Sequence, residues 1–209
     1  MNNLAAVSPA FWLPKKSQAF RPKIGYFNAR SAALLNVTHQ SPDPKFATYI
    51  ENFRFTKAGV LFVVVHVVGS GNNHRADHPA SMKEFNGRNA ANLAFMKESF
   101  AEAILKDVPG VAVVIHANPD FEKGSKPGFK DFLASMRGFL AKYRKSVVCI
   151  HGDSHYYRID KPLKDESGGI YLHFTRMEVF GSPNVAGVVV SVDPNDPLVF
   201  SYRPYYLKD

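Results

Sequence analysis

Three short polar segments of the chain, each following an apolar run, contain side chains that could bind a metal ion or an anion. They are Asn72-Asn73-His74, His116-Ala117-Asn118-Pro119-Asp120, and His151-Gly152-Asp153-Ser154-His155 with Arg158 close behind. Because imidazoles and carboxylates from separate strand ends can converge on one rim of a sheet, segments far apart in the sequence can build one metal site. Histidine together with aspartate suits Zn, Mn or Fe. The alternative is that each histidine is a hydrogen-bonded structural residue at its strand end.

A serine-hydrolase interpretation of the third segment is less favourable. Gly152-Asp153-Ser154 resembles the Gly-Asp-Ser block of serine esterases, whose chemistry needs a serine activated by a histidine that a carboxylate orients. In those enzymes the block opens the domain and an Asp-x-x-His lies near the C-terminus. Here the block lies three-quarters of the way along the chain, and Ile170 stands three residues before His173. We therefore interpret the match as an accidental short string.

The elements that would position the three segments alternate between strands and amphipathic helices. Apolar runs predict strands, and apolar residues at spacings of three and four predict two helices. In chain order we expect strands at 51–56 and 60–68, a helix at 86–106, a strand at 111–115, a helix at 129–143, a strand at 147–150, and β structure at 170–180, 187–193 and 198–202. This order predicts an α/β layered domain. Loops at the C-terminal ends of such strands are favoured positions for ligand sites.

The first 45 residues differ in character from the rest of the chain. Pro9, Pro14 and Pro22 each remove a backbone donor, and Ser41-Pro42-Asp43-Pro44 is typical of a loop. We expect an irregular N-terminal arm at 1–45 and one α/β domain at 46–209.

The composition of the 209 residues excludes several classes of site and of protein. The one cysteine, Cys149, excludes a disulfide framework and a cysteine-based zinc site within the chain. The longest apolar run, 60–68, is broken by His66 and is far shorter than the roughly 20 residues that span a bilayer. No Lys or Arg precedes the first apolar stretch, so the N-terminus does not resemble a signal peptide, and the sequence leaves the localisation open.

The net charge of +8, from 26 Lys and Arg against 18 Asp and Glu, would be compatible with an anionic partner. The basic residues are scattered, however, and no nucleic-acid-binding motif accompanies them. We interpret them as solvated surface charge.

Several blocks of the sequence resemble the calcineurin-like metallophosphoesterases, and in particular a bacterial branch of that superfamily. The likeness runs from about residue 11 to about residue 202. The blocks are Glu51-Asn52-Phe53-Arg54-Phe55, Val67-Val68-Gly69-Ser70, Arg88-Asn89-Ala90-Ala91-Asn92-Leu93, Ile115-His116, His151-Gly152-Asp153-Ser154-His155 and Phe180-Gly181-Ser182-Pro183. The resemblance implies a β-sandwich flanked by helices, and a centre of two divalent metal ions (Mn, Fe or Zn) that activates a water to attack a phosphate ester.

The resemblance also assigns roles to individual residues. By position, His116 and His155 would be metal ligands, and Asp153 stands where the family has the first histidine of a Gly-His-x-His turn. A carboxylate oxygen can replace an imidazole nitrogen on a hard or borderline ion. His151 then competes for that role, or orients Asp153 or a metal-bound water. Asn118 and Arg158 would contact phosphate oxygens, with a surface salt bridge as the alternative for Arg158.

The sequence departs from the family in one large respect. The Asp-x-His, Gly-Asp-x-x-Asp and Gly-Asn-His-Asp/Glu blocks, which supply the bridging carboxylate and most ligands, are absent from their expected places. Gly71-Asn72-Asn73-His74 mimics the third block, but Arg75 follows it. We therefore expect an incomplete metallophosphoesterase-like α/β fold, corresponding to the C-terminal portion of the family, and a phosphate-ester hydrolase impaired when alone. The alternatives are a non-catalytic binding or scaffold domain with a basic surface, and a fragment whose exposed sheet edge makes it self-associate.

Overall fold

The structure of the chain is a computed structural model that describes residues 2–3 and 35–206. Most of the expected N-terminal arm, residues 4–34, lies outside the described residues. The strands of the described part are β1 (Asn2–Asn3), β2 (Thr38–His39), β3 (Phe53–Lys57), β4 (Val60–Val64), β5 (Gly110–Val114), β6 (Ser146–His151), β7 (Arg158–Asp160), β8 (Phe174–Glu178), β9 (Ala186–Val192) and β10 (Phe200–Tyr206). Its helices are α2 (Gly69–Asn72), α3 (Pro79–Leu105) and α4 (Lys130–Leu140), with 3-10 turns η2 (Pro44–Phe46) and η3 (Pro127–Phe129).

A seven-stranded mixed sheet forms the centre of the fold, in the order β2-β3-β4-β5-β6-β8-β7. The four strands β4, β5, β6 and β8 run parallel, whereas the outer strands are antiparallel to their neighbours. The apolar runs at 60–64 and 110–114 form interior strands of this sheet. Their continuous apolar character is what strands need when both faces of the sheet are covered. The carboxyl ends of the four parallel strands therefore meet at one edge of the sheet.

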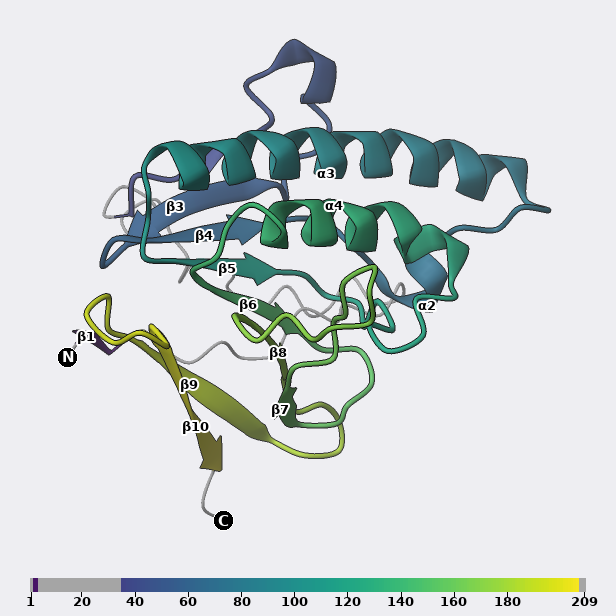
Figure 1. Cartoon of the computed structure of the whole chain (residues 1–209). Helices are drawn as coiled ribbons and strands as arrows, with labels where there is room; N and C mark the ends of the chain where they lie inside the picture. The colour runs from purple at the N-terminus through teal and green to yellow at the C-terminus, as the bar shows by residue number, and fades with distance from the viewer. Residues whose placement is uncertain (1, 4–34, 207–209) are drawn as a thin grey trace, which may run out of the picture.

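Helices α3 and α4 cover one face of this sheet (Figure 1). Their buried aromatic side chains meet between the two helices, where the rings of Phe100 and Phe139 stack with centroids 4.0 Å apart. Helix α3 begins at Pro79, which suits the first helical position, and the Nδ1 atom of His78 accepts a hydrogen bond from the Ser81 N–H.

The hairpin of β9 and β10 covers the other face of the sheet (Figure 1). Its buried residues Val188, Val190 and Phe200 belong to one apolar cluster with Val148 and Met177 of the sheet. Strand β1 pairs with the free side of β9. The sheet thus lies between a helical layer and a hairpin layer, each with its own apolar core.

The prediction of an α/β fold is confirmed, as a seven-stranded mixed sheet with a hairpin and few helices. The structure differs from the expected elements in several places. Strand β4 ends at Val64 rather than at residue 68, and the short elements β1, β2 and α2 were not expected. Helix α3 starts at Pro79 rather than at residue 86, because Pro79 and the His78 cap initiate it earlier. Strand β7, which pairs with β8, was not expected. None of the helices of the described part is long and apolar enough to cross a membrane.

Candidate functional site

The rim formed by the carboxyl ends of β4, β5 and β6 is the candidate functional site. His66 follows β4, His116 follows β5, and Asp153 lies in the turn after β6. The ends of parallel strands in α/β sheets commonly bind ligands, because the loops that follow them diverge and leave a crevice.

His116 and Asp153 lie side by side at this rim. The His116 Nε2 atom is 3.9 Å from the Asp153 Oδ1 atom, and the two side chains are 43% and 35% exposed. Asp153 has a positive φ of 78°, which aspartate tolerates better than most residues. Gly69 of α2 lies against the Asp153 carboxylate, since a Cβ added at Gly69 would be 2.8 Å from Oδ1. The structure therefore brings together two of the three expected metal ligands.

His155, the third expected ligand, is oriented by a neighbouring turn. Its Nδ1 atom donates to the carbonyl oxygen of Ser182 over 2.9 Å, and this peptide group precedes a cis proline, Pro183. The His155 ring packs directly on Gly181, where an added Cβ would be 2.5 Å from the ring. Because the Nδ1 proton is committed to Ser182, a neutral His155 ring has a lone pair on Nε2.

The two expected phosphate-contacting residues already have partners. The Asn118 amide donates to the Ser154 hydroxyl over 2.6 Å, which connects the loops after β5 and β6. Arg158 forms ion pairs with Glu178 at 2.7 Å and with Glu122 at 3.2 Å. Arg158 therefore has the salt-bridge role that was the alternative to phosphate binding. A substrate phosphate would have to compete with two carboxylates for its guanidinium.

His151 lies beneath the turn that carries Asp153. His151 is only 1% exposed, and its ring Nδ1 atom donates to the Gly152 carbonyl oxygen over 3.1 Å. Burial lowers the pKa of His151 to about 4, so the ring is neutral near pH 7. Its Nε2 atom has no hydrogen-bond partner among the described residues. His151 therefore contacts the peptide group between Gly152 and Asp153.

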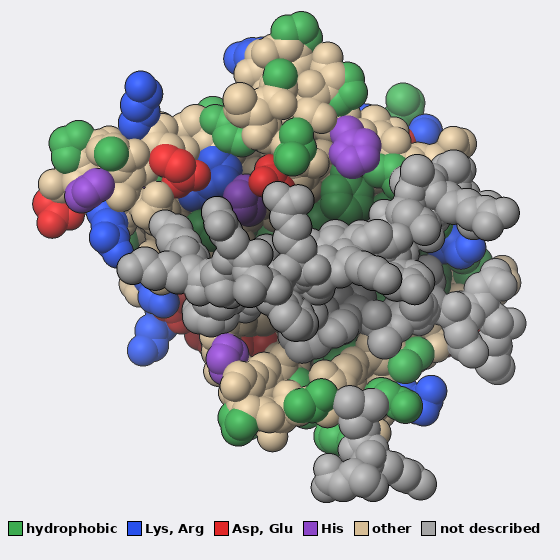
Figure 2. Space-filling model, turned by 180° about the vertical axis from the view of Figure 1, so that it is seen from behind, with side chains coloured by type: hydrophobic (Ala, Val, Ile, Leu, Met, Phe, Trp, Pro, Cys, Tyr) green, Lys and Arg blue, Asp and Glu red, His purple; other side chains and the backbone are tan. Residues whose placement is uncertain are grey.

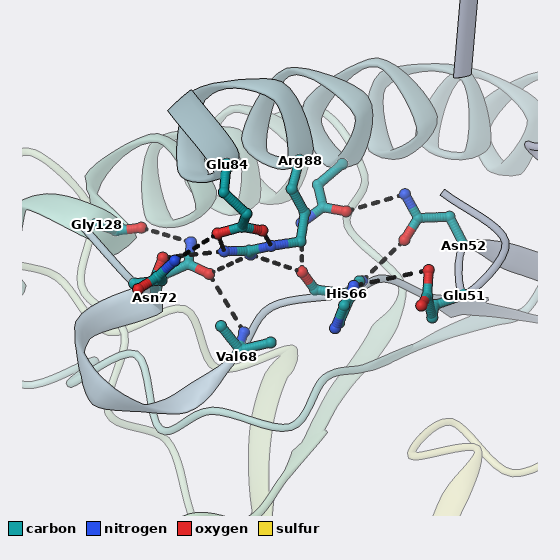
Figure 3. A network of polar contacts seen from close by, with 10 residues as sticks. Glu51, Asn52, His66, Val68, Asn72, Glu84, Arg88 and Gly128 are labelled. Atoms are coloured by element: carbon teal, nitrogen blue, oxygen red, sulfur yellow. Dashed lines mark hydrogen bonds and ion pairs between the residues drawn. The ribbon is translucent and has the colours of Figure 1, made fainter. Parts of the chain in front are cut away.

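His66 is a rim residue that the sequence reasoning did not assign to the site. The backbone N–H of His66 donates to Asn52 Oδ1 over 2.8 Å. Its backbone carbonyl oxygen accepts from the Arg88 guanidinium at 3.0 Å and from the Asn92 side-chain amide at 2.8 Å (Figure 3). Burial lowers the pKa of the His66 imidazole, while Glu51, with Oε2 3.7 Å from Nδ1, partly offsets this. The only signal in the sequence was the break that His66 makes in the apolar run 60–68.

Arg88 links the rim to a left-handed turn. Its guanidinium donates to the Asn72 side-chain oxygen at 2.5 Å and to the Asn72 carbonyl oxygen at 3.1 Å, and it pairs with Glu84 at 2.5 Å (Figure 3). The residues 70–73 all have positive φ, between 51° and 70°, a conformation that costs roughly 1–2 kcal/mol per non-glycine residue. The Asn72 amide also donates to the Gly128 carbonyl oxygen over 2.8 Å. Buried hydrogen bonds thus stabilise a backbone conformation that is unfavourable by itself.

Gly128 packs against this turn backbone to backbone. A Cβ added at Gly128 would overlap the carbonyl oxygen of Gly71 and would also crowd the Cβ atoms of His74 and Asn72. The turn therefore depends on a glycine that lies more than fifty residues further along the chain.

The donor set of the described residues does not fit a two-metal centre. No three His, Cys, Asp or Glu side chains of the described part lie close enough together to hold a metal ion. Residues 1–34 contain none of these four residue types, and residues 207–209 add only Asp209. Two ions about 3.5–4 Å apart need a shared carboxylate or hydroxide and ligands on both sides, and no such set is present among residues 35–206.

Comparisons with known proteins add no family assignment. No protein-family model matches the chain, and a search of the curated proteins returns no match.

Proposed function

We propose that the chain is a phosphate-ester-acting domain of the metallophosphoesterase type, with the rim at His116 and Asp153 as its ester-binding site. The layering of the sheet against the β9–β10 hairpin is compatible with the β-sandwich of that superfamily. The observation that carries the proposal is the juxtaposition of His116 and Asp153, which come from the ends of two neighbouring parallel strands.

The side chains at the rim offer complementary functions toward a phosphate ester. The imidazole of His116 can donate a hydrogen bond to a phosphate oxygen, and the Asp153 carboxylate lies 3.9 Å from its Nε2 atom. His155, two residues after Asp153, keeps a lone pair on Nε2 when neutral, because its Nδ1 proton is donated to Ser182. Because no three His, Cys, Asp or Glu side chains of the described part lie close enough together to hold a metal ion, we expect this chain alone to hydrolyse esters slowly.

Turnover of a chromogenic phosphodiester tests the proposal. We expect bis(p-nitrophenyl) phosphate to be hydrolysed slowly with Mn²⁺ added, and His116→Ala to reduce the rate at least about tenfold because the positioned imidazole is lost. His39→Ala, which removes an exposed imidazole on β2, is the matched control and should leave the rate unchanged. A rate that is equal in wild type and His116→Ala contradicts the proposal.

A second candidate function is non-catalytic binding of an anionic partner. The lack of a three-donor cluster in the described part and the net charge of +8 both favour it. On the face shown in Figure 2, however, Lys and Arg side chains are dispersed among other side chains rather than gathered in one patch. Salt-dependent binding of polyphosphate in the presence of EDTA, undiminished in the His116→Ala, His155→Ala double variant, would support this function over the first.

A further inference from the structure

Three aromatic side chains from separate segments gather where the end of β10 meets the loop after β8. The rings of Tyr157 and Phe180 are stacked with centroids 4.4 Å apart, and Tyr206 meets Phe180 edge to face at 5.6 Å. Tyr157 and Phe180 pack against the hairpin core, whereas Tyr206 is 62% exposed. Core packing therefore accounts for two of the rings and leaves most of the Tyr206 surface open. We call these three residues the aromatic platform.

The aromatic platform is connected to the rim through His155. The His155 ring packs on Gly181, the residue after Phe180, and its Nδ1 atom donates to the Ser182 carbonyl oxygen over 2.9 Å. Tyr157 follows Asp153 by four residues, and four residues of chain reach at most about 14 Å. A ligand bound at Asp153 could therefore extend past His155 onto the platform.

The chemistry of the platform favours a planar aromatic ligand group. Tyrosine rings stack on nucleobases because every base has a π-face, and such stacking tolerates different bases. Tyrosine also suits a partly wet position, since its ring is apolar and its hydroxyl can stay in water. An aliphatic ester group would gain only apolar contact from the same rings.

We propose that the ester bound at the rim carries a nucleobase that stacks on Tyr206, so that the ligand class of this site is a free nucleoside phosphate. The sugar would cross the interval at His155 between the phosphate and the base. The inference rests on the proposed function for the phosphate end alone. Tyr206 lies beyond residue 202, where the resemblance to the metallophosphoesterases ends, so its role comes from the ring contacts and not from that resemblance.

Binding of adenosine 5′-monophosphate (AMP), adenosine and ribose 5-phosphate to the full chain in EDTA tests the inference. We expect AMP to bind at least about fivefold more tightly than ribose 5-phosphate, because only AMP can stack. Ring currents from Tyr206 should move the adenine H2 and H8 resonances upfield. Tyr206→Ser should raise the Kd of AMP to that of ribose 5-phosphate and abolish the upfield shift, while ribose 5-phosphate binds as before.

Two variants of β10 keep the test specific. Tyr206→Phe retains the ring and should retain the preference for AMP. Tyr205→Ser removes an exposed tyrosine from the same strand, and because side chains alternate along a strand, Tyr205 points away from the platform. This control should bind AMP like the wild type. A single-stranded oligoadenylate should bind no more tightly than AMP, and tighter binding would overturn the assignment to a free nucleotide.

Equal affinity of the wild type for AMP and ribose 5-phosphate, or AMP binding unchanged in Tyr206→Ser, would overturn the inference. Its failure is distinguishable from that of the proposed function. Binding of adenosine that depends on Tyr206, without ester turnover or phosphate binding that depends on His116, would refute only the proposed function. Binding of ribose 5-phosphate that depends on His116, with no gain from an added base, would refute only the nucleoside assignment.

Discussion

At the scale of single residues, His151 couples the stability of the chain to pH. Burial lowers its pKa from the ordinary 6.5 to about 4, so below pH about 6.5 the unfolded chain binds a proton that the folded chain does not. The free energy of unfolding should therefore fall as the pH decreases from about 6.5 toward 4, and be fully recovered above that range. From the size of the pKa shift, the His151 share of this loss is about 2 kcal/mol at pH 5.0 relative to pH 7.5.

Urea unfolding of the wild type and of His151→Leu at the two pH values measures this share. His66 and His173 also have pKa values lowered by burial, and both variants keep them. The difference in pH dependence between the two proteins therefore isolates His151. Equal pH dependence in both would contradict the prediction.

The contact between Gly181 and His155 makes a second prediction at the residue scale. Gly181→Ala places a Cβ 2.5 Å from the His155 ring, so the ring must move away from Ser182 and the chain should lose about 1–3 kcal/mol of stability. Imidazole nitrogen chemical shifts should show that His155 no longer has its proton fixed on Nδ1. Gly138→Ala is the control, since nothing lies near its added Cβ in α4 and the chain should gain up to about 1 kcal/mol.

Residue types and their positions at strand ends were sufficient to suggest that His116 and Asp153 meet. The sequence could not identify the partners that set their neighbours' geometry. The Ser182 carbonyl that orients His155 and the side chains around His66 come from segments distant in the chain, and only the packing of loops and of helix α3 against the sheet brings them together. The tautomer of His155 and the position of His66 therefore could not be predicted from the sequence.

At the scale of elements, Arg88 connects α3, the end of β4 and the left-handed turn of residues 70–73. Arg88→Met should destabilise the chain by about 2–4 kcal/mol, because the buried Asn72 and His66 oxygens lose a donor. Lys106→Met, at the end of the same helix, removes an exposed ion pair with Glu102 and should change stability by less than about 0.5 kcal/mol. Denaturant unfolding of both variants checks the prediction, which fails if the two changes are equal.

The elements that the sequence predicted well are those with a continuous apolar signal, such as β4, β5 and the buried stripe of α4. Strand β7 has no such signal, since Arg158 and Asp160 flank an exposed Ile159. Its backbone pairs antiparallel with β8, and two pairs of opposite residues, Arg158 with Glu178 and Asp160 with Arg176, form ion pairs across the two strands. The local sequence pattern cannot predict a strand that is stabilised by charged residues distant in the chain.

At the scale of the whole molecule, two apolar cores share one sheet, so both should unfold together. Phe95→Ala in the helical core and Phe200→Ala in the hairpin core should each lower the free energy of unfolding by about 3–5 kcal/mol. Circular dichroism and amide hydrogen exchange should report one transition in each variant. A separate early transition of β9 and β10 in Phe200→Ala would show that the hairpin is an independent unit.

The contact between Gly128 and the turn at Gly71 also bears on which sequences can encode this rim. The space at Gly128 is closed by a backbone oxygen, which cannot rotate away as a side chain would. In a saturation library selected for folded protein, every replacement at Gly128 should disappear regardless of its polarity, whereas replacements at the exposed Lys126 should persist. During evolution, residues that face a ligand could then change while Gly128 stays the same. The backbone shape of the rim should therefore be retained even when the side chains that would bind a ligand are replaced.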